Sequence, residues 1–456
     1  MAERALAPRD VVDAGLCIGC GACAIGEAMA WDRYGQLKPD ESWSPRSVKA
    51  FEHVCPFSPD SANEDEIAAA RFDQPAQRDP QIGSFEAAYV GHVAEHSFRP
   101  DGSSGGMVSW VAAELLAKGL VDGIAHVAPV DPKEEGRFFR YRISRAIDEV
   151  RGGARSRYYP VEMSGVLDEI RRVPGRYAIV GVPCFIKAVH LLRAQDPVLN
   201  ERIAYTLGLF CGHMKSARMV DSFAWQLDAP FEQVRAVEYR RKDPDRPANW
   251  YTAQLTLADG SARWQDWWHL VDGDWGAGFF QNPACNYCDD VVAETADVAF
   301  GDAWVEPYSS DGRGTNVVIA RSREVQQLIE QAISEDRLAL DHVDAAFIAN
   351  TQAAGFRQRR EGLAYRLRVH PPRLPLRKRV APGGRDLPPR RKLVYRMRRW
   401  ISAGSHRLFY AARVSGIHGL YLRWARISLR LYESFAYLRW RLGAVLQRVE
   451  GDRDAG

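Results

Sequence analysis

The eight cysteines constrain this chain of 456 residues more than any other feature, because they divide into two sets of four. The first set opens with a C-x2-C-x2-C run made by Cys17, Cys20 and Cys23, in which most spacer residues are Gly or Ala. Short loops of small residues let three thiolates converge on one side of an inorganic cube. The run therefore predicts a 4Fe-4S cluster.

The fourth ligand of this cluster must come from elsewhere in the chain. In a bacterial ferredoxin run the fourth cysteine would stand at the position of Glu27. Cys55 is followed by Pro56, and a Cys-Pro pair is how such runs often end. We therefore expect Cys55 to be the fourth ligand. A carboxylate from Glu27 is the less favoured alternative, because these clusters prefer thiolates.

The second set of cysteines is more scattered. Cys184 and Cys211 each follow an apolar run, and Cys285 with Cys288 forms a C-x2-C pair. Taken singly, Cys184 and Cys211 are equally typical of small buried hydrophobic residues. The pair is also typical of a zinc half-site or a redox dithiol. Because four cysteines remain and none is left over, the sequence favours a second cluster.

The N-terminus and the hydropathy of the chain indicate a compartment. Residues 1–10 contain no apolar core of a secretory signal, so we expect reduced thiols in the cytoplasm. No run of about 18 apolar residues occurs, so no membrane span is predicted. We expect a cytoplasmic protein that is at most peripheral to the inner face of the membrane.

Charge and proline content divide the chain. From Pro371 onward it holds 20 of the 61 Lys and Arg residues but only 5 of the 58 Asp and Glu residues. Pro- and Gly-rich segments between residues 371 and 389 indicate a linker. We expect a ferredoxin-like iron-sulfur segment at 1–80, a central α/β domain at 81–370 that holds the second cysteine set, and a basic amphipathic helical tail at 371–456.

The central part alternates between strand and helix patterns. We expect strands at 87–94, 123–130, 177–182, 203–210, 296–300 and 316–320, and helices at 106–118 and 185–193. This alternation predicts an α/β fold with a mixed or partly parallel sheet and flanking helices. Ligands of such sheets gather beyond the carboxyl ends of strands, where Cys184 and Cys211 are expected.

A Gly- and Ser-rich turn at residues 101–107 precedes the first long helix of this central part. Unpaired N–H groups at a helix N-terminus favour phosphate, and a dinucleotide such as FAD would present its diphosphate there. The turn lacks a P-loop lysine and a G-x-G-x-x-G pattern. An ordinary helix cap therefore stays open as the alternative.

Several motifs together make the chain resemble the beta subunit of the coenzyme F-420 hydrogenase/dehydrogenase family. The resemblance covers roughly residues 10 to 350 and rests on these segments: 17–23, 102–106, 181–184, 208–213, 285–288 and 296–304. Their common order along the chain is more specific than any one of them.

The resemblance implies an iron-sulfur flavoprotein oxidoreductase that passes electrons between 4Fe-4S clusters, FAD and a substrate. Its relatives include subunits that reduce the deazaflavin coenzyme F-420, and ferredoxin-dependent reductases that act on divinyl chlorophyllide and hydroxymethyl chlorophyll. It assigns Cys184, Cys211, Cys285 and Cys288 to one cluster, and to flavin contact Ser103, Ser104, Gly105 and Gly106. Members often carry eight cysteines in the ferredoxin segment, whereas this chain has four there, so the path by which electrons enter is expected to differ.

Four polar residues near these motifs are candidates for roles at the site. His213 and Lys215 follow Cys211 and are expected to hydrogen-bond to, or bias the potential of, a cluster or flavin. The favoured alternative for Lys215 is a solvated surface lysine. Asp302 at a strand end is a candidate for a flavin contact or a structural cap. Lys187 is a candidate phosphate ligand or a plain exposed lysine.

Aromatic residues crowd the segment before the C-x2-C pair. Trp264, Trp267, Trp268 and Trp275 are more typical of a core than of a substrate platform. No Ser-His-Asp order, H-E-x-x-H or Walker pattern occurs, so hydrolase and phosphotransfer functions have no supporting motif.

The tail has a helical apolar pattern of its own. Between Leu420 and Leu446 apolar residues recur at helical spacing, and Arg423, Arg426, Arg430 and Arg441 lie off that stripe. Such a basic amphipathic helix suits an anionic membrane surface or an acidic partner. Packing of the helix against the acidic body is the alternative. No nucleic-acid module accompanies the charge.

Two function classes remain open from the sequence. The protein is either a reductase with its own small-molecule pocket, served by ferredoxin or another redox protein, or an electron-transfer subunit that serves a separate partner enzyme. A reductase should turn over a small molecule by itself, whereas a subunit should reduce only dyes until its partner is added.

Overall fold

The computed structural model describes residues 5–43 and 50–454, so Met1–Arg4, part of the stretch examined for a signal, lies outside the described residues. The N-terminal segment carries little regular structure. Its elements are α1 (Pro8–Asp13), β1 (Met29–Trp31), β2 (Leu37–Pro39), α2 (Phe51–Val54) and α3 (Glu64–Arg71), followed by the hairpin of β3 (Gln77–Asp79) and β4 (Gly83–Phe85). The cysteine run lies between α1 and β1.

An eight-stranded mixed sheet forms the centre, in the order β15-β5-β14-β13-β9-β8-β6-β7. Its strands are β5 (Ala87–Val93), β6 (Gly123–Pro129), β7 (Phe139–Ser144), β8 (Tyr177–Gly181), β9 (Ile203–Leu209), β13 (Val298–Asp302), β14 (Asn316–Ala320) and β15 (Leu338–His342). The four middle strands, β13, β9, β8 and β6, run parallel, and the remaining neighbours pair antiparallel. The α/β fold class with a mixed sheet is confirmed.

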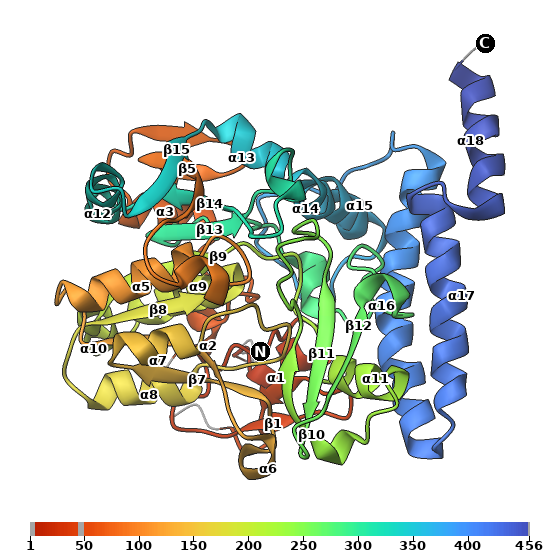
Figure 1. Ribbon diagram of the computed structural model, residues 1–456, viewed down its shortest axis with the longest axis horizontal. Coiled ribbons are helices and arrows are strands. Elements are labelled where there is room, and N and C mark those ends of the chain that lie inside the picture. Colours follow the sequence, from red (N-terminus) through yellow and green to blue (C-terminus); the bar gives the residue numbers. More distant parts are fainter. Residues whose placement is uncertain (1–4, 44–49, 455–456) are drawn as a thin grey trace.

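Helices cover both faces of this sheet (Figure 1). They are α4 (Phe98–Asp101), α5 (Met107–Ala117), α7 (Ile147–Gly152), α8 (Ser164–Arg172), α9 (Pro183–Arg193), α10 (Pro197–Arg202) and α12 (Arg323–Ser334), whereas the short α6 (Pro132–Glu135) lies at the end of the sheet beside β10 (Val234–Glu238). Alternate residues of a strand point to opposite faces. In β8, Val180 accordingly packs in the core under α5 and α12, and Ile179 packs in the core under α8 and α9.

All eight elements expected in the central part are present, with ends that differ by a few residues at most. Strand 316–320 matches the expectation, and the expected strand 296–300 is shifted to β13. The expected strands were recognised because apolar residues predominate in them, which is the pattern of strands buried on both faces. The edge strands β7 and β15 were missed because they lack this pattern: polar residues alternate with apolar ones in β7, and β15 ends in Asp341 and His342.

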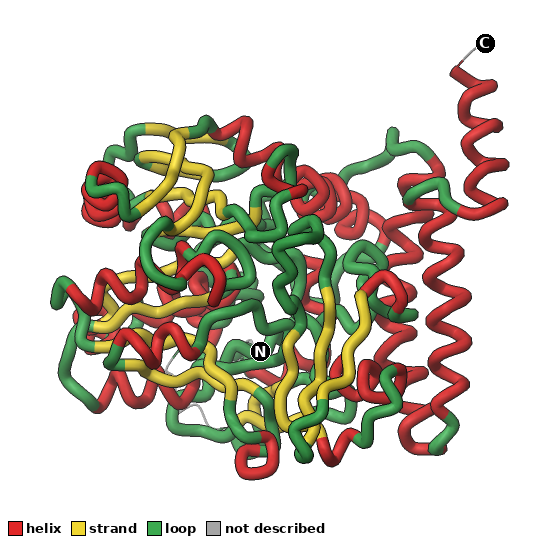
Figure 2. Tube along the Cα trace, in the orientation of Figure 1, coloured by secondary structure: helices red, strands yellow, loops and turns green. Residues whose placement is uncertain are grey.

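A second, three-stranded antiparallel sheet lies beside the main sheet (Figure 2). It consists of β10 (Val234–Glu238), β11 (Thr252–Leu257) and β12 (Ala262–Asp266), and it follows α11 (Arg218–Gln226). The C-terminal elements are α13 (Ala345–Thr351), α14 (Ala353–Arg359), α15 (Glu361–Val369), α16 (Pro389–Ser415), α17 (His418–Ala436) and α18 (Trp440–Asp454). None of the described helices combines the length and hydropathy that a bilayer-spanning segment requires.

The segment expected to be a linker is held by buried ion pairs. Arg379 makes a bidentate pair with Glu294 at 2.6 and 2.9 Å, and Lys378 lies 3.2 Å from Asp289. Burial raises the pKa of Asp289, but Lys378 and Arg379 outweigh it and hold that pKa well below its usual value. The cations of residues 371–388 therefore tie the tail to the body.

The tail helix expected over 420–446 is broken in the structure. α17 ends at Ala436, and Leu438 and Trp440 adopt positive φ angles of 56° and 65° before α18 projects away from the body. A Cβ on Gly443 would lie 2.3 Å from the Leu438 carbonyl carbon, so only glycine permits so tight an elbow. The expectation of one continuous helix was wrong, because the periodicity of apolar residues does not register the left-handed backbone at Leu438 and Trp440.

The buried ion pairs give a stability prediction for the tail. Replacing Arg379 with Met should lower the free energy of unfolding by about 3 kcal/mol, because the buried Glu294 would keep only Arg360 and the buried Asp289 only Lys378 as ion-pair partners. The matched control is Arg377→Met, since Arg377 pairs with Glu66 at an exposed position and should contribute at most about 1 kcal/mol. Equal losses in denaturant unfolding of the two variants would contradict this account.

Candidate functional site

The parallel pairing of β8 with β9 brings two distant cysteines to one edge of the sheet. In this register Val180 lies opposite Leu207, and Gly181 lies opposite Gly208. Both strands end at the same edge, and the chain then continues to Cys184 in the first turn of α9 and to Cys211 after β9. The expectation that ligands gather beyond the carboxyl ends of these strands therefore has a structural basis.

The C-x2-C pair joins these two cysteines. Cys285 lies in a 3-10 turn, Pro283–Tyr287, and Cys288 follows that turn directly. Burial raises the pKa of Cys184 well above its ordinary value, and the neighbouring thiolates of Cys288, Cys211 and Cys285 raise it further. The structure thus brings together the four cysteines of the second set.

A buried arginine lies among these four thiols. Arg359 of α14 is 2% exposed and donates to the carbonyl oxygens of Cys211 at 3.0 Å and Gly212 at 2.7 Å. Burial opposes its charge, but the four thiolates outweigh that effect and raise its pKa. Arg359 therefore supplies positive charge where negative thiolates would gather.

The first set of cysteines surrounds a small cavity of about 30 Å³. Cys17, Cys20, Cys23 and Cys55 all line it, and Glu27 is not among its lining residues. Burial is the main reason that the pKa of Cys20 is raised to about 12 and that those of Cys23 and Cys55 are raised as well. Cys55 therefore has the position expected of the fourth ligand.

The two sets of cysteines are close to each other. The charge of Cys20 from the first set raises the pKa of Cys184 in the second set. The pKa of Tyr141 is raised mainly by burial, and the charges of Cys184 and Cys20 raise it further. Ile18 and Phe57 line both the small cavity and the large one described next. The two sets therefore lie near each other, with Ile18 and Phe57 in the walls of both cavities.

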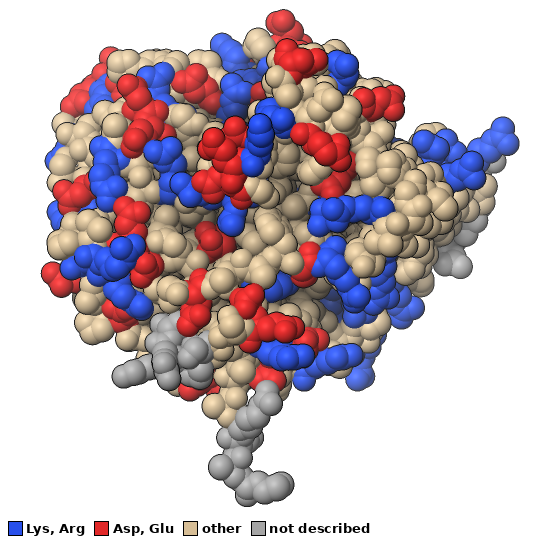
Figure 3. All heavy atoms as spheres, turned by 90° about the horizontal axis from the view of Figure 1, so that it is seen from below, with Lys and Arg blue, Asp and Glu red and all other residues tan. Residues whose placement is uncertain are grey.

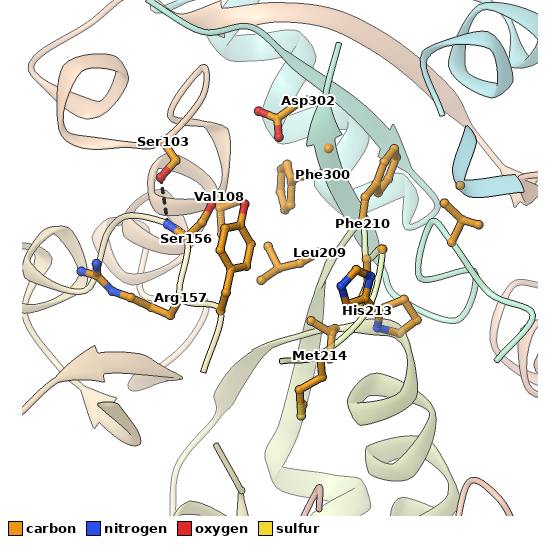
Figure 4. A pocket seen from close by; sticks show the side chains of 18 of the residues that line it. Ser103, Val108, Ser156, Arg157, Leu209, Phe210, His213, Met214, Phe300 and Asp302 are labelled. Carbon is orange, nitrogen blue, oxygen red and sulfur yellow. Dashed lines mark hydrogen bonds between the residues drawn. The ribbon is translucent and has the colours of Figure 1, made fainter. Parts of the chain in front are cut away.

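A large cavity of about 850 Å³ opens beside the second set, and all four of its cysteines line the wall. The Gly- and Ser-rich turn lies across this cavity (Figure 4). Ser103 Oγ accepts a hydrogen bond from Ser156 N at 2.9 Å, and Ser104 Oγ donates to Thr315 O at 2.9 Å. A Cβ on Gly105 would lie 2.8 Å from Gly91 O, so the turn packs tightly against the sheet. Of the four residues expected to contact flavin, Ser103, Ser104 and Gly106 line the cavity.

Positive charge dominates the cavity wall. Arg155, Arg157 and Arg240 contribute to it on the side of the turn. The pKa of Arg157 is lowered to about 10, mainly by burial and then by Arg155, and its Nε has no hydrogen-bond partner in the described part of the chain. A buried guanidinium with an unused donor fits an anionic ligand such as a diphosphate.

The opposite wall contains His213, which a tail residue orients. His213 is buried, and its ring stacks on Trp275 at 4.3 Å between centroids. Burial lowers its pKa well below the ordinary value, with Lys215 and Arg398 adding to that effect, so the ring is neutral. Arg398 of α16 lies 3.4 Å from Nδ1 and can only donate, which leaves the proton on Nε2. Nε2 has no partner among the described residues, so it is free to donate to a ligand.

Lys215 is not the surface lysine that the sequence favoured. It is 0% exposed, donates to Phe279 O at 2.7 Å and lies 4.9 Å from the centroid of the Trp275 ring. Burial, assisted by Arg398, lowers its pKa from 10.5 to about 7. The expectation was wrong because the polarity of a lysine in the sequence does not reveal that distant segments of the folded chain bury it.

The other two polar candidates lie in different environments. Asp302 lines the cavity and pairs with Arg240 at 3.0 Å, so its carboxylate is neutralised in place. Lys187 is not among the residues that line the cavity. It is 3% exposed and pairs with Glu64 at 3.3 Å, which rules out the plain exposed lysine.

The tryptophans divide into three environments. Trp267 belongs to a core cluster, Trp275 lines the cavity, and Trp264 and Trp268 are about half exposed.

Sequence reasoning missed Arg359, Arg398 and Arg157 at the site. These arginines follow no motif and come from distant segments, so the sequence carries no local signal for them.

The buried ammonium of Lys215 gives a prediction about pH. Its pKa lies below that of the unfolded chain, so the unfolded state binds more protons between the two values and the wild type gains stability as pH rises through that window. Replacing Lys215 with Met should therefore stabilise the protein more at about pH 6 than at about pH 9, as measured by thermal unfolding. Exposed Lys133→Met is the control and should show no such difference. An equal effect of Lys215→Met at both pH values would contradict the shift.

Comparisons with known proteins agree with this architecture. Residues 88–168 match the model for the N-terminal part of the coenzyme F420 hydrogenase/dehydrogenase beta subunit, and residues 175–346 match the model for its C terminus. A chain of the F420-reducing [NiFe] hydrogenase complex from Methanosarcina barkeri has a similar fold, with 16% identity and a TM-score of 0.50 over 66% of this chain and 99% of that chain. A comparison with curated proteins gave no match. The chain belongs to the coenzyme F420 hydrogenase/dehydrogenase beta subunit family.

Proposed function

We propose that this protein is an iron-sulfur flavoprotein oxidoreductase that passes electrons between two 4Fe-4S clusters, FAD and a small-molecule substrate, with coenzyme F420 as the leading candidate substrate. One observation carries the proposal: four cysteines and the Gly- and Ser-rich turn line the same cavity of about 850 Å³. The family membership supports a redox function in general. The proposal adds the cofactors and the residues that hold them.

The cysteines fit clusters better than single metal ions. In the ranges 5–43 and 50–454, no three His, Cys, Asp or Glu side chains converge closely enough to hold one metal ion. Each set of four cysteines instead lines a cavity wall. A cube of iron and sulfide takes one thiolate at each iron and so needs its ligands spread around a volume, whereas zinc draws four ligands to one point. Cys17, Cys20, Cys23 and Cys55 would hold one cluster, and Cys184, Cys211, Cys285 and Cys288 the other.

The large cavity suits a dinucleotide. Its volume is within the range typical of cofactor sites. The turn at 102–106 leads into α5, and the nearby Arg157 adds positive charge that suits a diphosphate, whereas Arg155 already pairs with Glu238. The neutral His213 offers a donor at Nε2 to an acceptor atom of a planar ring. A bound flavin would supply the exchange between two-electron and one-electron chemistry.

The spacing of the two cysteine sets supports electron transfer between them. The electrostatic influence of Cys20 on Cys184 and the shared lining residues Ile18 and Phe57 support transfer between neighbouring sites. We propose that ferredoxin or another redox protein exchanges electrons at the first set, and that the protein works in the reducing cytoplasm, where thiols persist.

A second candidate function is an electron-transfer subunit without a substrate of its own. The likeness to a chain of a hydrogenase complex favours it, since that chain works beside other subunits. Both candidates require the same clusters and flavin. They differ in whether the isolated protein turns over a small molecule.

Cofactor analysis of anaerobically purified protein tests the ligand assignment. Replacing Cys20 with Ala and, separately, Cys285 with Ala should each remove about half of the iron and acid-labile sulfide, because each set holds one cluster. Cys55→Ala should also lose iron, whereas Glu27→Gln should retain it and so serves as the matched control. Wild-type protein that carries no iron, or carries zinc in its place, would overturn the assignment.

An activity assay separates the two candidate functions. The holoprotein with a reduced viologen as donor should reduce coenzyme F420, as followed by loss of its visible absorbance. Cys285→Ala should abolish this reduction, since the second set lies beside the cavity. Holoprotein that reduces dyes but neither coenzyme F420 nor another small molecule would instead favour the electron-transfer subunit.

A further inference from the structure

The helical hairpin of α16 and α17 lies beyond residues 88–346, which match the family models. Its two helices run antiparallel at one edge of the molecule, with α17 outermost (Figure 1). This part of the chain also lines the cavity through Arg398 and Tyr437. The hairpin is therefore built into the molecule, while one of its faces is turned outward.

The inward face of α17 is already satisfied. Its buried residues Tyr421, Ala425, Ser428 and Tyr432 recur at helical spacing. Tyr421 packs against Phe280 at 5.6 Å between ring centroids and donates to Asp272 at 2.9 Å. This line of residues therefore packs α17 against the body, which is the alternative to membrane binding that the sequence left open.

The outward face carries the apolar stripe that the sequence showed. Leu420, Ile427 and Leu431 are 46%, 61% and 41% exposed, and they lie along one side of α17. On α16, Trp400 is 54% exposed, and its ring centroid lies 5.5 Å from that of Trp424 of α17. The apolar surface therefore continues across both helices. A helix that is apolar on both sides is typical of one that is covered on both sides.

The charge on this surface has one sign. Within α16 and α17, both fully described, there are 11 Lys and Arg residues and one carboxylate, Glu433, which is buried and paired with Arg439. Arg423, Arg426 and Arg430 are exposed beside the stripe of α17. Figure 3 shows basic and uncharged atoms over this right-hand edge of the molecule, whereas acidic atoms are scattered over the body.

Three kinds of partner could bind the exposed apolar face of the hairpin, and the chemistry of that face favours one of them. A second copy of the hairpin would bring arginines against arginines, which costs free energy. An acidic protein would need an apolar centre of matching shape in addition to its carboxylates. An anionic bilayer satisfies both features at once, because aliphatic side chains enter the acyl boundary, tryptophans lie at the headgroup level and arginines contact phosphates.

We propose that the outward face of the α16–α17 hairpin docks the protein on an anionic phospholipid surface. The stripe of Leu420, Ile427 and Leu431 enters the bilayer interface, and Arg423, Arg426 and Arg430 contact the lipid phosphates. The docking is peripheral, and it holds the cavity beside the membrane because the same hairpin forms part of the cavity wall.

Vesicle flotation of the full-length protein tests this docking. Wild type should float with vesicles of phosphatidylcholine that contain roughly 30 mol% phosphatidylglycerol, and binding should weaken as salt is added. It should partition at least about tenfold more weakly into pure phosphatidylcholine. The triple variant Arg423→Gln/Arg426→Gln/Arg430→Gln should lose about 100-fold in partitioning, since each juxtamembrane arginine contributes several-fold. Ile427→Ser/Leu431→Ser should lose about tenfold.

The matched control removes three exposed arginines from the body, Arg142, Arg145 and Arg172, each as Arg→Gln. It should partition like the wild type, which separates docking from net charge. Unchanged thermal unfolding of each variant keeps a folding defect apart from a docking defect. Absence of flotation would overturn the proposal, as would equal losses in the control and hairpin variants. A concentration-dependent dimer that Ile427→Ser/Leu431→Ser dissociates, without vesicle binding, would assign the face to a second copy instead.

Discussion

The parallel pairing of β8 with β9 is the constraint on which the site depends. Parallel neighbours end at the same edge of a sheet, so the segments that follow them are brought together whatever their separation in sequence. Cys184 and Cys211 are adjacent for this reason. The C-x2-C pair, the guanidinium of Arg359 and the large cavity are arranged around that edge. A shift in the register of these two strands would disperse all of them.

Electrostatics joins the tail to this core. Lys378 and Arg379 neutralise carboxylates that are buried next to the second set of cysteines, and Arg398 fixes the protonation of His213 in the cavity wall. Taking one partner away would leave a charge or a donor without compensation in a medium where water cannot replace it. The tail therefore contributes to the site as well as to stability, although it lies outside the residues that the family models match.

The two sides of the C-terminal hairpin have different physical roles. One side packs aromatic rings and hydrogen-bonds to the body, and the other exposes aliphatic residues beside arginines. Folding of the chain satisfies only the first side. The second side can be covered only by something outside the chain. For this reason we inferred that an anionic surface covers it, and not the acidic body of the same chain.

The sequence by itself determined six of the eight strands of the central sheet, the α/β class and the division of the cysteines into two sets, because buried strands and short-spaced ligands leave local patterns. It also contained the apolar stripe of the tail but could not say which way that stripe faces. Tertiary structure alone decided that Lys215 is buried, that Lys187 pairs with Glu64 and that three arginines from distant segments surround the site. Burial and the pairing of charges are properties of how distant segments meet, and that meeting is set by sheet order and packing, which no local pattern encodes.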